Sequence, residues 1–280
     1  MNLSMNARAW IISSVVFAVF LAIWAGGTMQ TGPATQYADP EYAALMGGAA
    51  NDSGGLPTPA AVWSTTLDNL SEPFYDNGPN DKGVGVQLAY SLGRVMAGFA
   101  LAVLVGVPLG FLIGMSPMMY KALNPFIQIL KPVSPLAWMP LALYTIKDAS
   151  ASAIFVIFIC SIWPILVNTA HGVMSVRKDW LAVAQTLEIG SLRTAALVIL
   201  PAAAPTILTG MRISMSIAWL VIVAAEMLVG GTGIGYYIWN EWNNLDLSNV
   251  IFSILLIGVV GMVLDLLFGL LGRAVSYQEV

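Results

Sequence analysis

The stretch LGRVMAGFALAVLVGVPLGFLIGM, residues 92–115, decides the fold class. Its only charged residue is Arg94. At 1.5 Å of rise per residue, a helix of roughly 20 apolar residues crosses the ~30 Å hydrocarbon layer of a membrane. The stretch therefore predicts a transmembrane helix. Within it, Gly106, Gly110 and Gly114 recur every four residues. Such a stripe either lets a second backbone approach closely or simply reflects the abundance of glycine in membrane helices.

The composition of the whole chain agrees with a membrane protein. Hydrophobic residues make up 58% and charged residues 9% of its 280 positions, where a soluble domain carries about 25% charged residues. So few charges cannot cover a water-facing surface of this length. The single cysteine, Cys160, allows neither a disulfide framework nor a cysteine metal site.

Five further apolar runs raise the prediction to about six transmembrane helices in an all-α integral membrane protein. The first ends at Gly27 and could also be interpreted as a secretory signal, but its length and the spans that follow favour an uncleaved first helix within residues 1–27. The others are residues 122–146, 151–173, 205–229 and 249–271.

The distribution of charge predicts the orientation. Residues 28–86 carry seven acidic residues against Lys82 alone, so we expect this segment to be extracytoplasmic, with a short surface helix over residues 60–70. We find no motif in its acidic part, residues 30–55. The basic residues cluster in the connection 174–204, which places that loop and both termini in the cytoplasm. Residues 87–280 form the predicted transmembrane core.

The cytoplasmic connection 174–204 is too long for a simple turn. Its apolar residues from Trp180 to Leu187 keep helical spacing, which predicts a helix over residues 179–192 on the membrane surface. Such a helix is a natural docking surface for a peripheral partner.

The third span contains Pro132, Pro135 and Pro140, so we expect it to be broken. Irregular backbone at membrane depth is tolerated only against protein or a water-filled cavity. We therefore expect a pathway beside this break, with Ser134 and Trp138 among its residues.

The polar residues of the fifth span share one helical face, at Arg212, Ser216, Trp219 and Glu226. We predict that this face lines the same pathway. Arg212 could instead extend to the membrane surface, and for Glu226 a structural hydrogen-bonding role is favoured over substrate contact, because a carboxylate repels an anion.

Nothing in the chain favours catalysis. His171 is the only histidine, so a histidine metal centre is excluded and no Ser/His/Asp set is available. No metal site and no catalytic residue are expected. The glycines at 230, 231, 233 and 235 predict a flexible turn, and no phosphate-binding GxxxxGK[ST] loop occurs. An intramembrane enzyme and an anchoring protein remain as alternatives to a transport subunit, but neither explains the polar face or the broken span.

The cytoplasmic loop resembles the signature loop of permease subunits of binding-protein-dependent ABC importers, roughly E-A-A, three residues, G, and a later L-P. The similar residues are Ala182, Ala184, Gln185, Thr186, Leu187, Glu188, Gly190 and Ser191, followed by Leu200 and Pro201. Ala182 stands at the family's glutamate position and Glu188 at its glycine position. Further stretches similar to the family, in order, are residues 92–98, 106–110, 135–140, 209–212 and 218–227.

The branch it resembles transports nitrate, sulfonate and taurine, and residues 226–243 are most similar to nitrate, nitrite, cyanate or bicarbonate permeases. The resemblance implies a type I importer fold in the inner membrane. It also implies a second permease subunit, in a homodimer, two ABC ATPases that bind the ATP and dock on the loop residues above, and an extracytoplasmic substrate-binding protein. The implied substrate is nitrate, with bicarbonate or a sulfonate such as taurine as alternatives. Neither a cofactor of the chain itself nor a nucleic-acid partner is expected.

Overall fold

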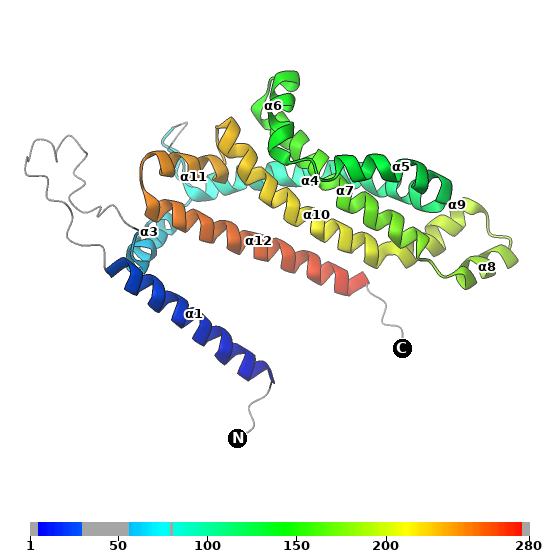
Figure 1. The fold of residues 1–280 in the computed structure, drawn as a ribbon, viewed down its shortest axis with the longest axis horizontal. Coiled ribbons are helices and arrows are strands. Elements are labelled where there is room, and N and C mark those ends of the chain that lie inside the picture. Colours follow the sequence, from blue (N-terminus) through cyan, green and yellow to red (C-terminus); the bar gives the residue numbers. More distant parts are fainter. Residues whose placement is uncertain (1–4, 30–55, 79–80, 276–280) are drawn as a thin grey trace, which may run out of the picture. The chain divides into compact units, whose positions relative to one another are not determined.

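The computed structural model describes residues 5–29, 56–78 and 81–275, and their regular structure is helical (Figure 1). The acidic part of the predicted extracytoplasmic segment, residues 30–55, lies outside the described residues. The helices are α1 Met5–Met29, α3 Pro59–Ser71, α4 Val84–Met115, α5 Pro117–Leu130, α6 Pro135–Ile146, α7 Ala149–Met174, α8 Lys178–Thr186, α9 Ser191–Thr194, the π-helix η1 Ala195–Ile199, α10 Leu200–Val229, α11 Ile234–Asn243 and α12 Leu247–Val275.

The chain divides into two compact units. One contains the residues up to Glu72 together with Glu241–Phe252, and the other contains Pro73–Asn240 and the residues from Ser253 onward. In the first unit, the α3 helix starts at Pro59, after Thr58 accepts a hydrogen bond from the backbone N–H of Ala61 at 3.2 Å. This confirms the short helix predicted over residues 60–70.

The second unit is built around α7, which packs along both α4 and α10. The glycine stripe of α4 faces α7. A Cβ atom added at Gly110 would lie 2.6 Å from the carbonyl oxygen of Leu166, and one added at Gly114 would lie 2.7 Å from that of Ala170. The stripe therefore permits close approach of the α4 and α7 backbones. Apolar side chains alone would give α4 no preference for another helix over lipid.

The broken third span is confirmed. Helices α5 and α6 are separated by residues 131–134 and meet at an angle of 90°. Pro135 opens α6 because its missing N–H would have no partner in the first turn, and Pro132 lies in the break itself.

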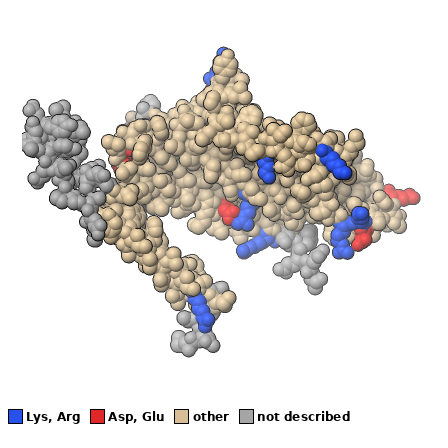
Figure 2. All heavy atoms as spheres, viewed as in Figure 1, with Lys and Arg blue, Asp and Glu red and all other residues tan. Residues whose placement is uncertain are grey.

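Five helices of the described residues are long and apolar enough to cross a membrane, and the bent pair α5 and α6 raises the number to six. Large apolar side chains lie on the exterior, among them Leu104 of α4 at 71% exposure and Leu255 of α12 at 53%. Lys, Arg, Asp and Glu are sparse on the face drawn in Figure 2. An exterior of this kind suits lipid, so the predicted all-α integral membrane fold is confirmed.

Candidate functional site

The α8 helix carries most of the predicted coupling residues. It begins after Arg177, whose guanidinium lies 3.2 Å from the Asp179 carboxylate and over the ring of Trp180. Ala184 is buried, whereas Ala182, Gln185 and Thr186 are exposed. The helix is therefore anchored through one face and presents the other.

The helix predicted over residues 179–192 is too long, because α8 ends at Thr186 and α9 begins at Ser191. Between them, Glu188 has a φ of 52°, in the left-handed region that terminates helices and favours glycine. The backbone N–H of Ile189 then donates to the carbonyl of Ala184 at 3.0 Å. Glu188 stands at the position where the family has glycine, and it adopts the left-handed conformation that glycine favours. Leu187, Glu188, Gly190 and Ser191 are all exposed here.

The break between α5 and α6 presents Ser134 at the start of α6. Its hydroxyl makes no capping hydrogen bond and the residue is exposed, while Trp138, one turn further on, is half-buried. Helix α6 contacts both α7 and α10. The two residues thus lie on a bent element that borders the helix carrying the predicted polar face.

On α10, Ser216 is exposed and Trp219 is buried. The indole N–H of Trp219 donates to the carbonyl of Ile257 in α12 at 3.0 Å. A Cβ atom added at Gly261 would lie 3.2 Å from the same indole, so glycine leaves room for the ring. Trp219 therefore joins α10 to α12 in this structure, and its place in a pathway stays a prediction.

Arg212 has a charged partner on a neighbouring helix. Its Nε donates to one carboxylate oxygen of Asp265 at 2.6 Å and its Nη2 to the other at 2.5 Å, which is a bidentate ion pair between α10 and α12. Sequence reasoning missed Asp265. The available signal was that it is the only charged residue in the run 249–271.

Glu226, the fourth residue of the predicted polar face, lies in a buried network of hydrogen bonds between α10 and α4. Its carboxylate accepts hydrogen bonds from the hydroxyl of Ser91 at 2.8 and 3.0 Å, from Nη1 of Arg94 at 2.7 Å and from the backbone N–H of Gly235 at 3.0 Å. The side chain of Glu226 is 2% exposed and that of Arg94 is 14% exposed. This geometry agrees with the structural hydrogen-bonding role favoured from the sequence.

The same network holds the glycine-rich turn, which was expected to be flexible. Gln87 accepts from the backbone N–H of Gly233 at 2.6 Å, Ser91 accepts from that of Ile234 at 2.9 Å, and Arg94 donates to the carbonyl of Thr232 at 2.7 Å. A Cβ atom at Gly233 would overlap the Glu226 carboxylate. Glycine is required here because the backbone passes directly over a buried charge.

Gln87 and Ser91 were not identified as site residues from the sequence. They lie one turn apart on α4, at the same helical face as Arg94, so the spacing i, i+4, i+7 was the signal that could have found them.

Much of the chain is similar to known proteins. A family model described as the binding-protein-dependent transport system inner membrane component matches residues 106–277. The chain belongs to this family.

The permease is 45% identical over 214 residues to the nitrate import permease protein NrtB of Synechocystis sp., which covers 76% of this chain and 78% of that protein. It is 43% identical to the bicarbonate transport system permease protein CmpB of Synechocystis sp., over 80% of this chain and 79% of that protein. It is therefore an ABC importer permease, a multi-pass protein of the inner membrane.

Solved structures agree on the fold. The permease matches a chain of the inward-facing MetNI methionine ABC transporter with a TM-score of 0.60 at 13% identity, covering 67% of this chain and 94% of that one. It also matches a chain of an amino acid ABC transporter with a TM-score of 0.57 at 14% identity, covering 77% and 97%. The fold is that of a type I importer permease.

Proposed function

We propose that the permease carries a small monovalent inorganic anion, nitrate before nitrite or cyanate, into the cytoplasm as the membrane subunit of an ATP-driven importer. The observation that carries this proposal is its 43–45% identity to nitrate import permeases of Synechocystis sp., Leptolyngbya laminosa and Synechococcus elongatus, over 76–79% of the chain. The turn after Glu226, which the sequence resemblance singled out, is held by named buried side chains and so has a defined shape.

Bicarbonate is the second candidate. The identity of 43% to a bicarbonate permease over 80% of the chain supports it nearly as well. Both ions are small, planar and singly charged oxyanions. A pathway built for one would present the same hydrogen-bond donors and positive charge to the other.

The permease is proposed to be inactive alone. The exposed side of α8 and residues 187–191 is proposed to dock a separate ABC ATPase, because ATP must be bound by a subunit that has a phosphate loop. A second copy of the permease and an extracytoplasmic substrate-binding protein complete the proposed complex. This arrangement requires the loop 174–204 and both termini to be cytoplasmic, as the basic residues Arg177, Lys178 and Arg193 predict.

Uptake by the complete complex tests the proposal. Proteoliposomes containing the permease, its ATPases and its binding protein are given labelled nitrate, bicarbonate or taurine, with ATP inside. ATP-dependent accumulation of nitrate is the expected result. Uptake of bicarbonate alone would show that bicarbonate, and not nitrate, is the transported ion. Uptake of taurine without nitrate would overturn the proposal.

A further inference from the structure

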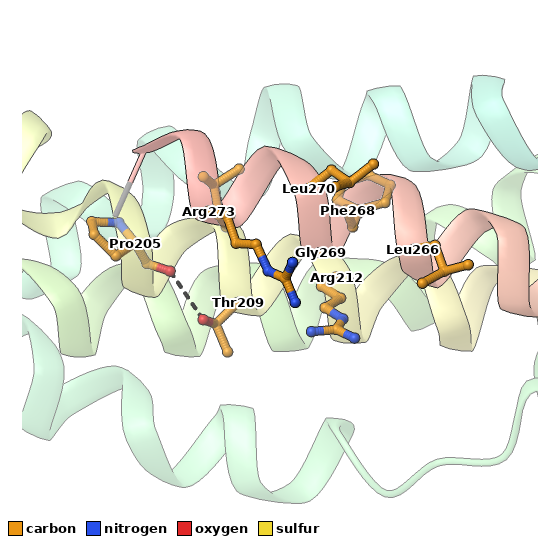
Figure 3. Close-up of a pocket in the computed structure, with 10 residues that line it drawn as sticks. Pro205, Thr209, Arg212, Leu266, Phe268, Gly269, Leu270 and Arg273 are labelled. Carbon is orange, nitrogen blue, oxygen red and sulfur yellow. Dashed lines mark hydrogen bonds between the residues drawn. The ribbon is translucent and has the colours of Figure 1, made fainter. Parts of the chain in front are cut away.

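A cavity with two arginines in a mainly apolar lining lies between α10 and α12, within the second unit. Its volume is about 390 Å³, and its lining includes Pro205, Thr209 and Arg212 from α10 and Gly269 and Arg273 from α12 (Figure 3). The volume lies within the range of small-ligand pockets, about 300–1,000 Å³. Figure 3 shows the guanidinium groups of Arg212 and Arg273 pointing into the same space beside Gly269.

Among the residues that the structure describes, the charges around this cavity do not balance. Asp265 neutralises Arg212, whereas Arg273 has no ion-pair or hydrogen-bond partner among residues 5–29, 56–78 and 81–275. Side chains on a helix lean toward its N-terminus, which directs Arg273 from the last turn of α12 back along the helix toward Arg212. Two guanidinium groups and one carboxylate leave one positive charge among the described residues here, on exposed side chains that a soluble ion can reach.

The free donors suit an oxyanion. The ion pair with Asp265 uses Nε and Nη2 of Arg212, so its Nη1 remains, together with the whole fork of Arg273. Planar forks bind oxyanions with two parallel hydrogen bonds. A Cβ atom at Gly269 would lie 3.8–3.9 Å from the Arg212 guanidinium, which places this residue of α12 directly beside the fork. The Thr209 hydroxyl donates to the carbonyl of Pro205 at 3.0 Å and is not counted as a donor.

We propose that Arg212 and Arg273 form a binding site for a singly charged oxyanion, in which Asp265 limits the affinity by occupying part of Arg212. The inference rests on the proposed function for one source of this ligand, the transported nitrate-type ion. The phosphate of an anionic lipid headgroup offers the same chemistry. A site for a transported ion must release it, and a carboxylate that competes for one guanidinium keeps binding weak enough for release.

Chemical labelling of arginine tests the site without transport. The purified full-length permease in phosphatidylcholine vesicles is treated with phenylglyoxal, and labelling of each arginine is followed by mass spectrometry in sodium nitrate or in sodium gluconate of the same ionic strength. At nitrate ten times above its dissociation constant, mass action predicts labelling of Arg273 about tenfold slower. Arg193, exposed on α9, is the internal control and should label equally in both salts.

The two sources of the oxyanion are separated by the lipid. Nitrate protection in phosphatidylcholine assigns the site to a small ion, whereas protection in phosphatidylglycerol vesicles without nitrate assigns it to a headgroup phosphate. Either outcome supports the site. Equal labelling of Arg273 under all these conditions would overturn it.

A pair of variants tests the role of Asp265. Asp265→Asn removes the competing carboxylate, so half-protection of Arg273 should need several-fold less of the protecting salt or lipid. The matched control Asp179→Asn also frees an arginine, Arg177, but far from the cavity along the chain, and should leave the half-protection point unchanged. An unchanged or raised half-protection point in Asp265→Asn would contradict the proposal.

Protection of Arg273 in a complex that takes up no nitrate would refute the proposed function alone, and nitrate uptake with Arg273 unprotected would refute this site alone.

Discussion

Glu226 is a carboxylate inside a membrane-spanning helix, and three donors surround it. Ser91, Arg94 and the backbone N–H of Gly235 supply hydrogen bonds of 2.7–3.0 Å. A charge removed from water costs several kcal/mol unless a partner of opposite sign and further hydrogen bonds compensate for it. Arg94 supplies the charge, and the glycine turn and Ser91 supply the remaining bonds. The stability of this end of the permease therefore depends on a few named atoms.

The first prediction concerns this buried pair. Arg94→Met should destabilise the permease by about 3–5 kcal/mol, because it leaves the Glu226 carboxylate buried without its cation. The double variant Arg94→Met with Glu226→Met should be more stable than Arg94→Met alone, since apolar residues can replace a buried ion pair at little cost. Thermal unfolding of the purified permease in detergent measures both. Arg212→Met, in a pair that is nearly half-exposed, is the control and should cost much less than Arg94→Met. Additive losses in the double variant would contradict the compensation argued for Arg94.

The second prediction concerns the strained residue after α8. Glu188 is held at a φ of 52°, which costs a non-glycine residue about 1–2 kcal/mol, while glycine loses about 0.5–1 kcal/mol more entropy on folding. Glu188→Gly should therefore stabilise the end of α8 by roughly 0.5–1 kcal/mol. Hydrogen exchange at the backbone amides of Leu187 and Ile189, which close the helix, should slow in this variant.

Glu188→Ala is the matched control, because it removes the same charge but keeps the strained conformation. Its amides should exchange no more slowly than those of the unaltered permease. Equal slowing in both variants would show that the charge, and not the backbone, sets the stability of this turn.

At the scale of elements, α8 is short and packed by one face. The buried Ala184 anchors it, and Leu187 at its end is 66% exposed. An exposed leucine on a helix that lies between two membrane-length helices is available for a partner surface. In the proposed complex, this element transmits closure of the ATPases to the membrane helices.

The third prediction is that Leu187→Asp uncouples the importer. If Leu187 enters a pocket of the ATPase, the variant loses about 1.5–3 kcal/mol of apolar burial, and each 1.4 kcal/mol weakens docking about tenfold. ATP-dependent uptake should be lost while the amount of permease in the membrane is unchanged, because the residue is exposed in the permease itself. Leu187→Met, which keeps an apolar side chain of similar volume, should retain uptake. Normal uptake by Leu187→Asp would remove Leu187 from the docking surface.

At the scale of the whole molecule, the predicted pathway must combine elements that the chain places far apart. The bent pair α5 and α6 contributes Ser134, and α10 contributes Ser216, while α6 and α10 contact each other. The two serines are exposed, whereas Ser214, two residues earlier on α10, is buried and donates to the carbonyl of Ser161 in α7 at 2.7 Å. The same helix thus offers a core-facing and an exterior-facing hydroxyl.

The fourth prediction is that water reaches the exterior-facing serines. In permease whose Cys160 is replaced by alanine, Ser134→Cys and Ser216→Cys should react with a membrane-impermeant thiol reagent in the assembled importer. Ser214→Cys is the matched control and should be protected. Alkylation followed by mass spectrometry measures all three. Protection of both exposed positions would show that lipid or another subunit, and not a water-filled pathway, covers this face.

Local signals in the sequence determined the spans, the break in the third span and the contact face of α4. Apolar length, proline and glycine act through the backbone of their own segment, so they can be interpreted without knowing the neighbouring helix. Helical spacing likewise placed Arg212, Ser216, Trp219 and Glu226 on one face of a predicted helix. Helical spacing could not identify the residues that this face contacts.

Only the tertiary structure decided the partners. Arg94 pairs with Glu226 across 132 residues of sequence, and Arg212 with Asp265 across 53. Periodicity fixes the direction of a side chain around its own helix axis, but the rotation and depth of one helix against another follow from packing over its whole length. That packing divides one polar face between two neighbours, sending Glu226 to α4 and the glycine turn and Arg212 to α12. It also leaves Arg273 unmatched beside Arg212 within the described part of the chain, a charge imbalance that no single segment of the sequence contains.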